Sequence, residues 1–355
     1  MNSAIVQEAI GALWGTTSDT TFFPIDDGLI NHSFKIKDAG GQLAFLQQLN
    51  SHVFPDAGII TENLSLIHAE LCKKNAQQLI ATPLSFCDGK KIFTDSLGNH
   101  WRASVFIESK TFHRPLHNQQ LGLAVESFAR FTALLHELDP DSLRLSIPDF
   151  HNLSLRFRQF REAIEQGDAA RIKDAAPLID ALLQRDDYVD LFSQVQDATT
   201  DFKKRIMHHD AKISNLLFNE EGTKLLSIAD LDTTMPGYFF SDVGDMVRSM
   251  AASSDENSTS SDKAFIDPKA YDIIYSSYRK NILAQLTPAE EEQLHSAGLL
   301  MIYMQSLRFL TDHLLGDTYY QIQRPGQNKD RASHQLDLLI SLEGLLKSNY
   351  NFSLL

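Results

Sequence analysis

Residues 208–232 read HHDAKISNLLFNEEGTKLLSIADLD, and this stretch decides how the rest of the chain is interpreted. Asp210 is followed five residues later by Asn215. Two short apolar runs come next, separated by the turn signal at 219–222, and the second run ends just before Asp230. The pattern predicts a polar loop and then a β-hairpin that returns Asp230 to the side of Asn215.

This order of residues supplies the groups that phosphoryl transfer requires. A carboxylate at 210 can orient and deprotonate an attacking hydroxyl group, and Asn215 and Asp230 carry the oxygen atoms that Mg²⁺ prefers. We therefore expect Asp210 to be the catalytic base and Asn215 and Asp230 to bind the metal. A lone His-x-Asp or Asp-x-Asp is more typical of an exposed loop or a helix cap, so the hypothesis depends on the whole pattern.

The run 208–215, followed by Ile-Ala-Asp-Leu-Asp at 228–232, resembles the aminoglycoside phosphotransferase and choline kinase superfamily. The resemblance implies a bilobal, protein-kinase-like α+β fold with a small antiparallel-sheet N-lobe and a larger, mainly helical C-lobe. It also implies ATP and Mg²⁺ as cofactors. The residue directly before Asp210 is a histidine and not an arginine, and Asp-Leu-Asp replaces the Asp-Phe-Gly of protein kinases. A small-molecule substrate is implied rather than a protein.

Longer runs are similar to the N-acetylhexosamine 1-kinases over roughly residues 20–345. They are GLINHSF at 28–34, FLQQLNSHVFP at 45–55, Trp101-Arg102 with FIE at 106–108, DLDTTMPG at 230–237, DVGDMVR at 242–248, RFLTD at 308–312 and Gly316-Asp317. The similarity implies an ATP-dependent kinase that phosphorylates the anomeric hydroxyl of an N-acetylhexosamine, an amino sugar. Two alternatives remain open. One is a kinase for another hydroxyl acceptor, such as an aminoglycoside, choline, homoserine or methylthioribose. The other is a non-catalytic protein that binds nucleotide or sugar.

The hydrophobic pattern divides the chain near residue 108. We expect residues 1–108 to form the nucleotide-binding lobe and residues 109–355 to form the catalytic and substrate-binding lobe. Before the division, short apolar or alternating runs bounded by turn signals predict strands. The expected strands are 20–25, 33–37, 43–49, 91–95 and 101–107, with helices at 2–13 and 61–77.

After the division the spacing becomes helical. The expected helices are 119–138, 150–166, 176–184 and 331–347. The run Thr287-Pro288-Ala289-Glu290 is a capping box with proline at the first helical position, and we expect it to open one long helix that ends near Leu315. The serine-rich segment 251–263 is expected to be a mobile loop.

A turn between the first two expected strands is the candidate phosphate-covering segment. Gly28 allows close backbone approach, and Asn31 and Ser33 offer hydrogen-bond donors. A single glycine in a hairpin more often marks only a turn, so the assignment depends on its place before the second strand. We also expect Gln48 to contact the nucleotide, and the adenine to lie against the linker that includes Glu108.

The third expected strand lacks the lysine that the phosphoryl-transfer template places there. Gln48 stands near that position and donates hydrogen bonds without supplying charge. Lys35 or Lys37 could substitute, the nucleotide could bind more weakly, or the metal could neutralise more of the charge. The template also pairs the lysine with a helix carboxylate, for which Glu62 and Glu70 are the candidates.

The substrate is expected near Arg308, Asp317 and Tyr319, because arginine and carboxylate groups suit sugar hydroxyls and aromatic faces suit sugar rings. A solvated helix end would have the same composition. Asp312 and Tyr320 belong to the same segment.

Three further residues are assigned to structural support, namely His208, Asp232 and Asp245, although Asp232 could instead contact the metal or the substrate. The resemblance implies that Asp245 accepts backbone N–H bonds from the catalytic loop, and Arg248 is a candidate partner for its carboxylate.

Composition excludes several classes of protein. The 355 residues include 32 Lys plus Arg and 46 Asp plus Glu, which gives a formal net charge of −14. Such a chain repels a phosphate backbone, so we expect no nucleic-acid partner. Only two cysteines are present, and neither a signal peptide nor a run of 18 apolar residues is recognisable. We expect a soluble cytoplasmic protein without a membrane partner, and the sequence leaves its oligomeric state open.

Overall fold

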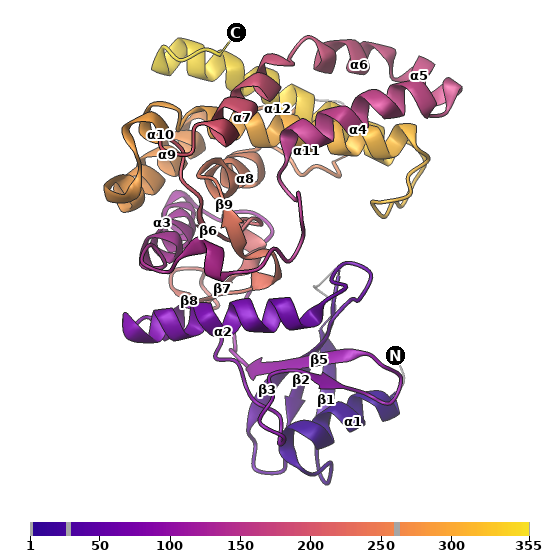
Figure 1. Ribbon diagram of the computed structural model, residues 1–355, viewed down its shortest axis with the longest axis vertical. Helices are drawn as coiled ribbons and strands as arrows, with labels where there is room; N and C mark the ends of the chain where they lie inside the picture. The colour runs from indigo at the N-terminus through magenta and orange to yellow at the C-terminus, as the bar shows by residue number, and fades with distance from the viewer. Residues whose placement is uncertain (1–2, 26–29, 259–262, 355) are drawn as a thin grey trace. The chain divides into compact units, whose positions relative to one another are not determined.

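The computed structural model describes residues 3–25, 30–258 and 263–354. Its elements confirm the predicted α+β class, because a five-stranded antiparallel sheet lies within the first 105 residues and helices dominate the remainder (Figure 1). Within the described ranges, every helix is too short or too polar to cross a membrane.

The secondary structure begins with a helix and then alternates between strands and helices. The strands are β1 (Thr21–Ile25), β2 (His32–Lys37), β3 (Leu43–Gln48), β4 (Phe93–Thr94), β5 (His100–Val105), β6 (Arg205–Met207), β7 (Leu216–Phe218), β8 (Leu225–Ile228) and β9 (Met235–Gly237). The α-helices are α1 (Ser3–Trp14), α2 (Ala57–Lys73), α3 (Asn118–Leu134), α4 (Leu153–Gln166), α5 (Ala169–Asp174), α6 (Ala176–Leu183), α7 (Asp187–Asp197), α8 (Phe240–Met250), α9 (Pro268–Ile282), α10 (Pro288–Glu292), α11 (Ser296–Leu314) and α12 (Gln327–Tyr350).

The chain divides into two compact units. The first contains Met1–Thr111, Leu134–Pro148 and Asn215–Pro236, and the second contains Phe112–Ala133, Asp149–Ser214 and Gly237–Leu355. The first unit therefore combines the large sheet with the β7–β8 hairpin, and the second holds most of the helices. The lobe boundary at residue 108 stays a prediction.

The five-stranded sheet of the first unit has the order β1-β2-β3-β5-β4, with antiparallel neighbours throughout. Successive side chains in a strand point to opposite faces of the sheet, so every second residue of a strand lies on the same face. One face packs against α1 and is apolar. Its core includes Ile5, Val6, Ile10 and Leu13 of α1 with Phe34, Ile36, Ala44, Leu46, Trp101 and Ala103 of the strands.

The β7–β8 hairpin belongs to the same unit. Leu216 is opposite Ile228 in its antiparallel register. The predicted turn residue Asn219 fixes the connection, because its side-chain oxygen accepts hydrogen bonds from the backbone N–H groups of Thr223 (2.9 Å) and Lys224 (2.8 Å). A bridge between Ile80 and Ile228 attaches the hairpin to the segment that follows α2.

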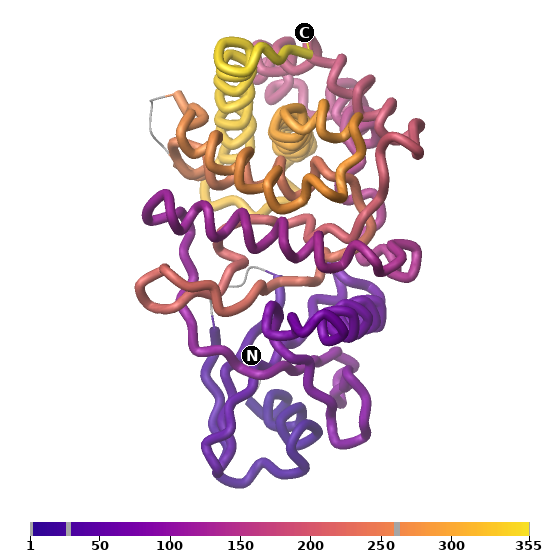
Figure 2. Tube along the Cα trace, turned by 90° about the vertical axis from the view of Figure 1, so that its left-hand side faces the viewer, coloured from indigo at the N-terminus to yellow at the C-terminus, as the bar shows by residue number. Residues whose placement is uncertain are grey.

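Helix α11 forms the centre of the second unit. It packs against α4, α8 and α12, as Figures 1 and 2 show. Residues on all sides of α11 are buried, which is expected of a helix enclosed by other helices.

The sequence prediction is wrong about the helix that begins after Thr287. The capping box is present, but it opens only the short helix α10, and a separate helix begins at Ser296. Leu294 in the break is still buried at 2% exposure. The apolar spacing therefore continues across the break and does not reveal it. The expected loop 251–263 is described apart from residues 259–262, and a bridge joins Ala252 to Ile266 at its ends.

Candidate functional site

The two predicted metal ligands lie at the open end of the β7–β8 hairpin. Asn215 immediately precedes β7, and Asp230 follows β8 after one residue. The backbone N–H of Ala229 donates to the carbonyl oxygen of Asn215 at 2.8 Å, which closes the ladder between them. Asp230 has a left-handed backbone with φ of 56°, a conformation that is uncommon for non-glycine residues but more frequent for aspartate than for most others. The hairpin thus returns Asp230 to the side of Asn215, as predicted.

A polar row crosses the face of the five-stranded sheet opposite α1. Ser33 is opposite Gln47, and Gln47 is opposite Arg102. Gln47 Nε2 donates to Ser33 Oγ at 3.0 Å, and Gln47 Oε1 accepts from Arg102 Nε at 3.0 Å and Nη2 at 2.7 Å. The amide of Gln47 therefore holds the guanidinium of Arg102 in a fixed orientation.

The row ends on Asp232, the second aspartate of the Asp-Leu-Asp run. Its Oδ1 forms an ion pair with Arg102 Nη1, and its Oδ2 accepts a hydrogen bond from Asn31 Nδ2 at 2.7 Å. Asn31 Oδ1 in turn accepts from the backbone N–H of Asn50 at 3.0 Å. The predicted phosphate-covering turn, the sheet and the segment after the hairpin are thus joined in one network within the first unit. Gly28 lies outside the described residues.

The register of the sheet sets Gln48 apart from the polar row. This residue is opposite His32 and Trp101 in the sheet, and Trp101 is fully buried in the core against α1. Gln48 therefore occupies the α1 face, whereas its neighbour Gln47 lies in the polar row. The sequence singled out Gln48, although the alternation that buries Trp101 assigns Gln47 and Arg102 to the opposite face.

The other charged residues predicted around the nucleotide have partners of their own. Lys35 forms an ion pair with Glu108, and its ammonium lies 4.7 Å from the centre of the Phe106 ring. The two candidate helix carboxylates also have partners: Glu62 pairs with Arg144 at 3.3 Å, and Glu70 pairs with Lys73 at 2.8 Å.

In the second unit, the loop around Asp210 is held by a buried carboxylate. Asp242 Oδ2 accepts from the backbone N–H of His208 at 3.0 Å, and Asp242 Oδ1 accepts from that of His209 at 2.7 Å. The family resemblance implied that Asp245 accepts these bonds, which is wrong. One helical turn after Asp242, Asp245 pairs instead with Arg248 at 2.8 Å.

The second unit places charge next to Asp210. Lys212 Nζ lies 2.8 Å from Asp210 Oδ2. Burial, and after it the charge of Asp210, raises the pKa of Asp245, although Arg248 acts in the opposite direction. Among the described side chains, Asp245 Oδ2 is a buried oxygen without a hydrogen-bond partner.

Two histidines shape the same loop. His208 is fully buried, and its ring forms an edge-to-face pair with that of Phe128, with the ring centres 5.1 Å apart. His209 has a left-handed backbone with φ of 66°, and Ser241 Oγ lies 2.7 Å from its Nδ1. The same hydroxyl lies 2.6 Å from Nδ1 of His151. Burial holds the pKa of His151 well below its usual value, so this ring stays neutral at neutral pH.

The predicted substrate residues form an aromatic cluster around Arg308 in the second unit. The guanidinium carbon of Arg308 lies 5.4 Å from the ring centre of Phe150, 5.9 Å from that of Tyr319 and 5.6 Å from that of Tyr320. Tyr319 is 71% exposed. The cluster therefore offers an aromatic face to solvent beside a cation.

The structure favours support over substrate contact for the two acidic residues of this segment. Asp312 accepts from the backbone N–H groups of Tyr319 (2.8 Å) and Tyr320 (2.9 Å), and so fixes both tyrosines beside Arg308. The side chain of Asp317, predicted to contact the substrate, is only 2% exposed and pairs with Arg171 at 2.5 Å. A carboxylate buried in an ion pair has little surface left for a ligand.

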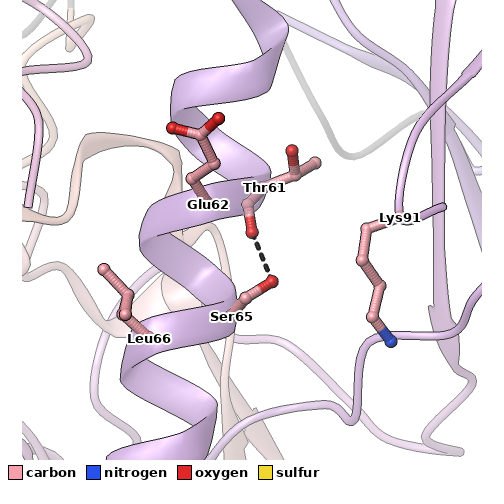
Figure 3. A pocket seen from close by; sticks show the side chains of 5 residues that line it. All are labelled: Thr61, Glu62, Ser65, Leu66 and Lys91. Carbon is pink, nitrogen blue, oxygen red and sulfur yellow. Dashed lines mark hydrogen bonds between the residues drawn. The ribbon is translucent and has the colours of Figure 1, made fainter.

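A hollow of about 460 Å³ lies elsewhere in the first unit (Figure 3). Thr61, Glu62, Ser65 and Leu66 line it from α2, and Lys91 lies across from them. The predicted base, metal ligands and substrate residues do not line this hollow.

Comparison with known proteins agrees with these features. The model of the phosphotransferase enzyme family matches residues 24–267. A spectinomycin phosphotransferase solved with ADP and spectinomycin aligns with 97% of this chain and 99% of its own, at 14% identity and a TM-score of 0.60. A microcompartment-associated aminopropanol kinase aligns over 99% and 98%, at 16% identity and a TM-score of 0.61. A choline kinase from Cryptosporidium parvum aligns over 98% and 99%, at 16% identity and a TM-score of 0.56. These likenesses confirm the kinase-like fold class.

Proposed function

Because the chain belongs to the phosphotransferase enzyme family, whose members act on hydroxyl acceptors, we propose that it transfers the γ-phosphoryl group of ATP to the anomeric hydroxyl of an N-acetylhexosamine. The observation that carries the transfer chemistry is the hairpin that returns Asp230 to the side of Asn215. Asn215 itself follows Asp210 by five residues in the sequence. A non-catalytic binding protein has no physical need for this combination.

The donor set fits Mg²⁺. Carboxylate and amide oxygens are hard ligands, and Mg²⁺ is usually bound by one or two carboxylates together with substrate phosphates. We assign Asn215 and Asp230 as the ligands. The bound ion would neutralise charge on the transferring phosphoryl group.

We assign Asp210 as the group that orients the acceptor hydroxyl and takes its proton. Asp242 fixes the preceding backbone, so the carboxylate is held on a braced loop. Asn31 is assigned to the nucleotide phosphates, and Glu108 to the neighbourhood of the adenine. Ser33 already accepts a hydrogen bond from Gln47, and its hydroxyl proton stays available for donation.

The surroundings of Arg308 favour a neutral, polyhydroxylated acceptor. Three aromatic rings surround its guanidinium, so the protein's own cation already occupies the position that a quaternary ammonium ligand would take. The charge of Arg308 also contributes to lowering the pKa of the half-buried Arg156, after burial itself. Two arginines this close oppose the binding of choline or an aminoglycoside, whereas Tyr319 and Arg308 suit a sugar ring and its hydroxyls.

A direct test is ADP release from MgATP with a panel of acceptors. The panel contains N-acetylglucosamine, N-acetylgalactosamine, glucosamine, choline, homoserine and kanamycin. We expect turnover with an N-acetylhexosamine, and a phosphorus–proton coupling to the anomeric proton of the product in NMR spectra. Turnover with a cationic acceptor alone would keep the phosphotransferase and reject the sugar. Nucleotide binding without turnover on any acceptor would favour the binding protein.

A further inference from the structure

We infer that Arg102, on β5, supplies the cation for the nucleotide phosphates that the third strand lacks. The inference rests on the proposed use of ATP. It concerns which residue of this chain neutralises the phosphate charge.

The register of the sheet brings Arg102 to the required position. The template lysine belongs on the third strand, where the polar face carries Gln47. Arg102 is directly opposite Gln47, and the Cβ atoms of directly opposed residues are about 4.5–5.5 Å apart. A side chain as long as arginine can therefore reach the space that a lysine at 47 would fill. Gln47 then serves as the acceptor that orients the guanidinium.

The guanidinium has donors left for an anion. Arginine has five N–H groups. Among the described residues, Nε and Nη2 each donate to Gln47 and Nη1 pairs with Asp232. One N–H on Nη1 and one on Nη2 remain. Both groups can donate to phosphate oxygens, and arginine is well suited to bind phosphate.

Burial makes this charge effective. The side chain of Arg102 is 12% exposed and that of Asp232 is 1% exposed, so the charge is weakly screened. Asp232 also takes the part of the missing helix carboxylate, because Glu62 and Glu70 pair with Arg144 and Lys73.

The rival cations on β2 are less suited. Lys35 lies on the same face but pairs with Glu108 beside Phe106. Lys37 is exposed at the end of the strand. Neither contacts the segment that holds Asp230 and Asp232 in the interactions of the described residues, whereas Arg102 does.

The test compares ligands that differ only in phosphate. Isothermal titration calorimetry would measure the dissociation constants of MgADP and of adenosine for wild type and Arg102→Gln. We expect MgADP affinity to fall roughly 10- to 100-fold, the usual cost of losing a hydrogen bond to a charged group, while adenosine affinity stays unchanged. Arg144→Gln is the matched control, because Arg144 also pairs with carboxylates of the first unit but lies outside the polar row.

Three further variants keep the test decisive. Arg102→Gln leaves Asp232 buried without its cation, so the same comparison is made between Asp232→Asn and Asp232→Asn/Arg102→Gln, in neither of which residue 232 carries a charge. Gln47→Lys/Arg102→Gln returns the cation to the third strand and should restore MgADP affinity. Equal losses for adenosine and MgADP, or no loss for either, would overturn the inference. Failure of wild type to bind MgADP would instead reject the proposed function.

Discussion

The carboxylate of Asp242 accepts a hydrogen bond from the backbone N–H of His209 at 2.7 Å, one residue before Asp210. Asp242 is fully buried, and its second oxygen accepts from the backbone of His208. Replacement by alanine leaves two buried N–H donors without a partner. We expect Asp242→Ala to lower the free energy of unfolding by roughly 2–3 kcal/mol and to reduce turnover, as measured by urea denaturation and kcat. Wild-type stability in this variant would show that the loop does not depend on Asp242.

A close approach of backbone to ring gives a second prediction. A Cβ at Gly237 would lie 2.3 Å from Cε1 of His209, which is too close for the ring to stay in place. We expect Gly237→Ala to destabilise the protein by about 1–3 kcal/mol and to lower kcat. Gly344→Ala on the exposed side of α12 is the control, since nothing lies within 4 Å of its new Cβ. That change should stabilise the helix by roughly 0.5–1 kcal/mol. Equal effects at the two positions would contradict the packing argument.

The aromatic cluster around Arg308 is expected to affect binding of the acceptor without affecting binding of the nucleotide. Arg308→Gln removes the cation among Phe150, Tyr319 and Tyr320, and we expect it to raise the KM for the acceptor sugar at least about tenfold while leaving MgADP affinity unchanged. Arg331→Gln is the matched control, because Arg331 also lies 5.4 Å from an aromatic ring centre, that of Phe309. An unchanged KM in Arg308→Gln would remove this cluster from the acceptor site.

His295 predicts how stability depends on pH. Burial lowers the pKa of His295 from 6.5 to about 4. Between these values the unfolded chain binds a proton that the folded chain excludes, so the stability present above pH 6.5 is lost as the pH falls. His295→Gln cannot titrate but keeps an acceptor near Tyr271, whose hydroxyl lies 2.7 Å from Nδ1 of His295. The urea midpoint of this variant should fall less between pH 7 and pH 4.5 than that of wild type. If the urea midpoints of wild type and variant fall equally between pH 7 and pH 4.5, His295 is not a cause of the pH dependence.

Sequence patterns predicted the elements whose signals are local. The five expected strands and the capping box at Thr287 are present because alternation, turn residues and caps act over a few residues. Helices α5, α7, α8 and α9 were not predicted. The buried face of α8 carries polar residues, among them Ser241, Asp242 and Asp245, so a search for apolar periodicity passes over it.

The candidate site was predicted where its residues adjoin in sequence and missed where they meet through folding. Asp210, Asn215 and Asp230 belong to one continuous stretch, and a short hairpin connects them. Arg102 meets Asp232 only because two distant segments pack together, and the choice between Gln47 and Gln48 needs the register of β3. The carboxylate of Asp317 is a group that suits sugar hydroxyls. Its pairing with Arg171 is a tertiary contact that the sequence does not reveal.

The measurement that tests the central claim most directly is the turnover of Asp210→Asn beside its nucleotide affinity. The amide has the shape of the carboxylate but cannot take the proton of an acceptor hydroxyl. We expect kcat with MgATP and N-acetylglucosamine to fall by roughly 10²- to 10⁴-fold, while MgADP affinity and the melting temperature stay close to those of wild type. A variant that keeps wild-type kcat would contradict the assignment of Asp210 as the catalytic base.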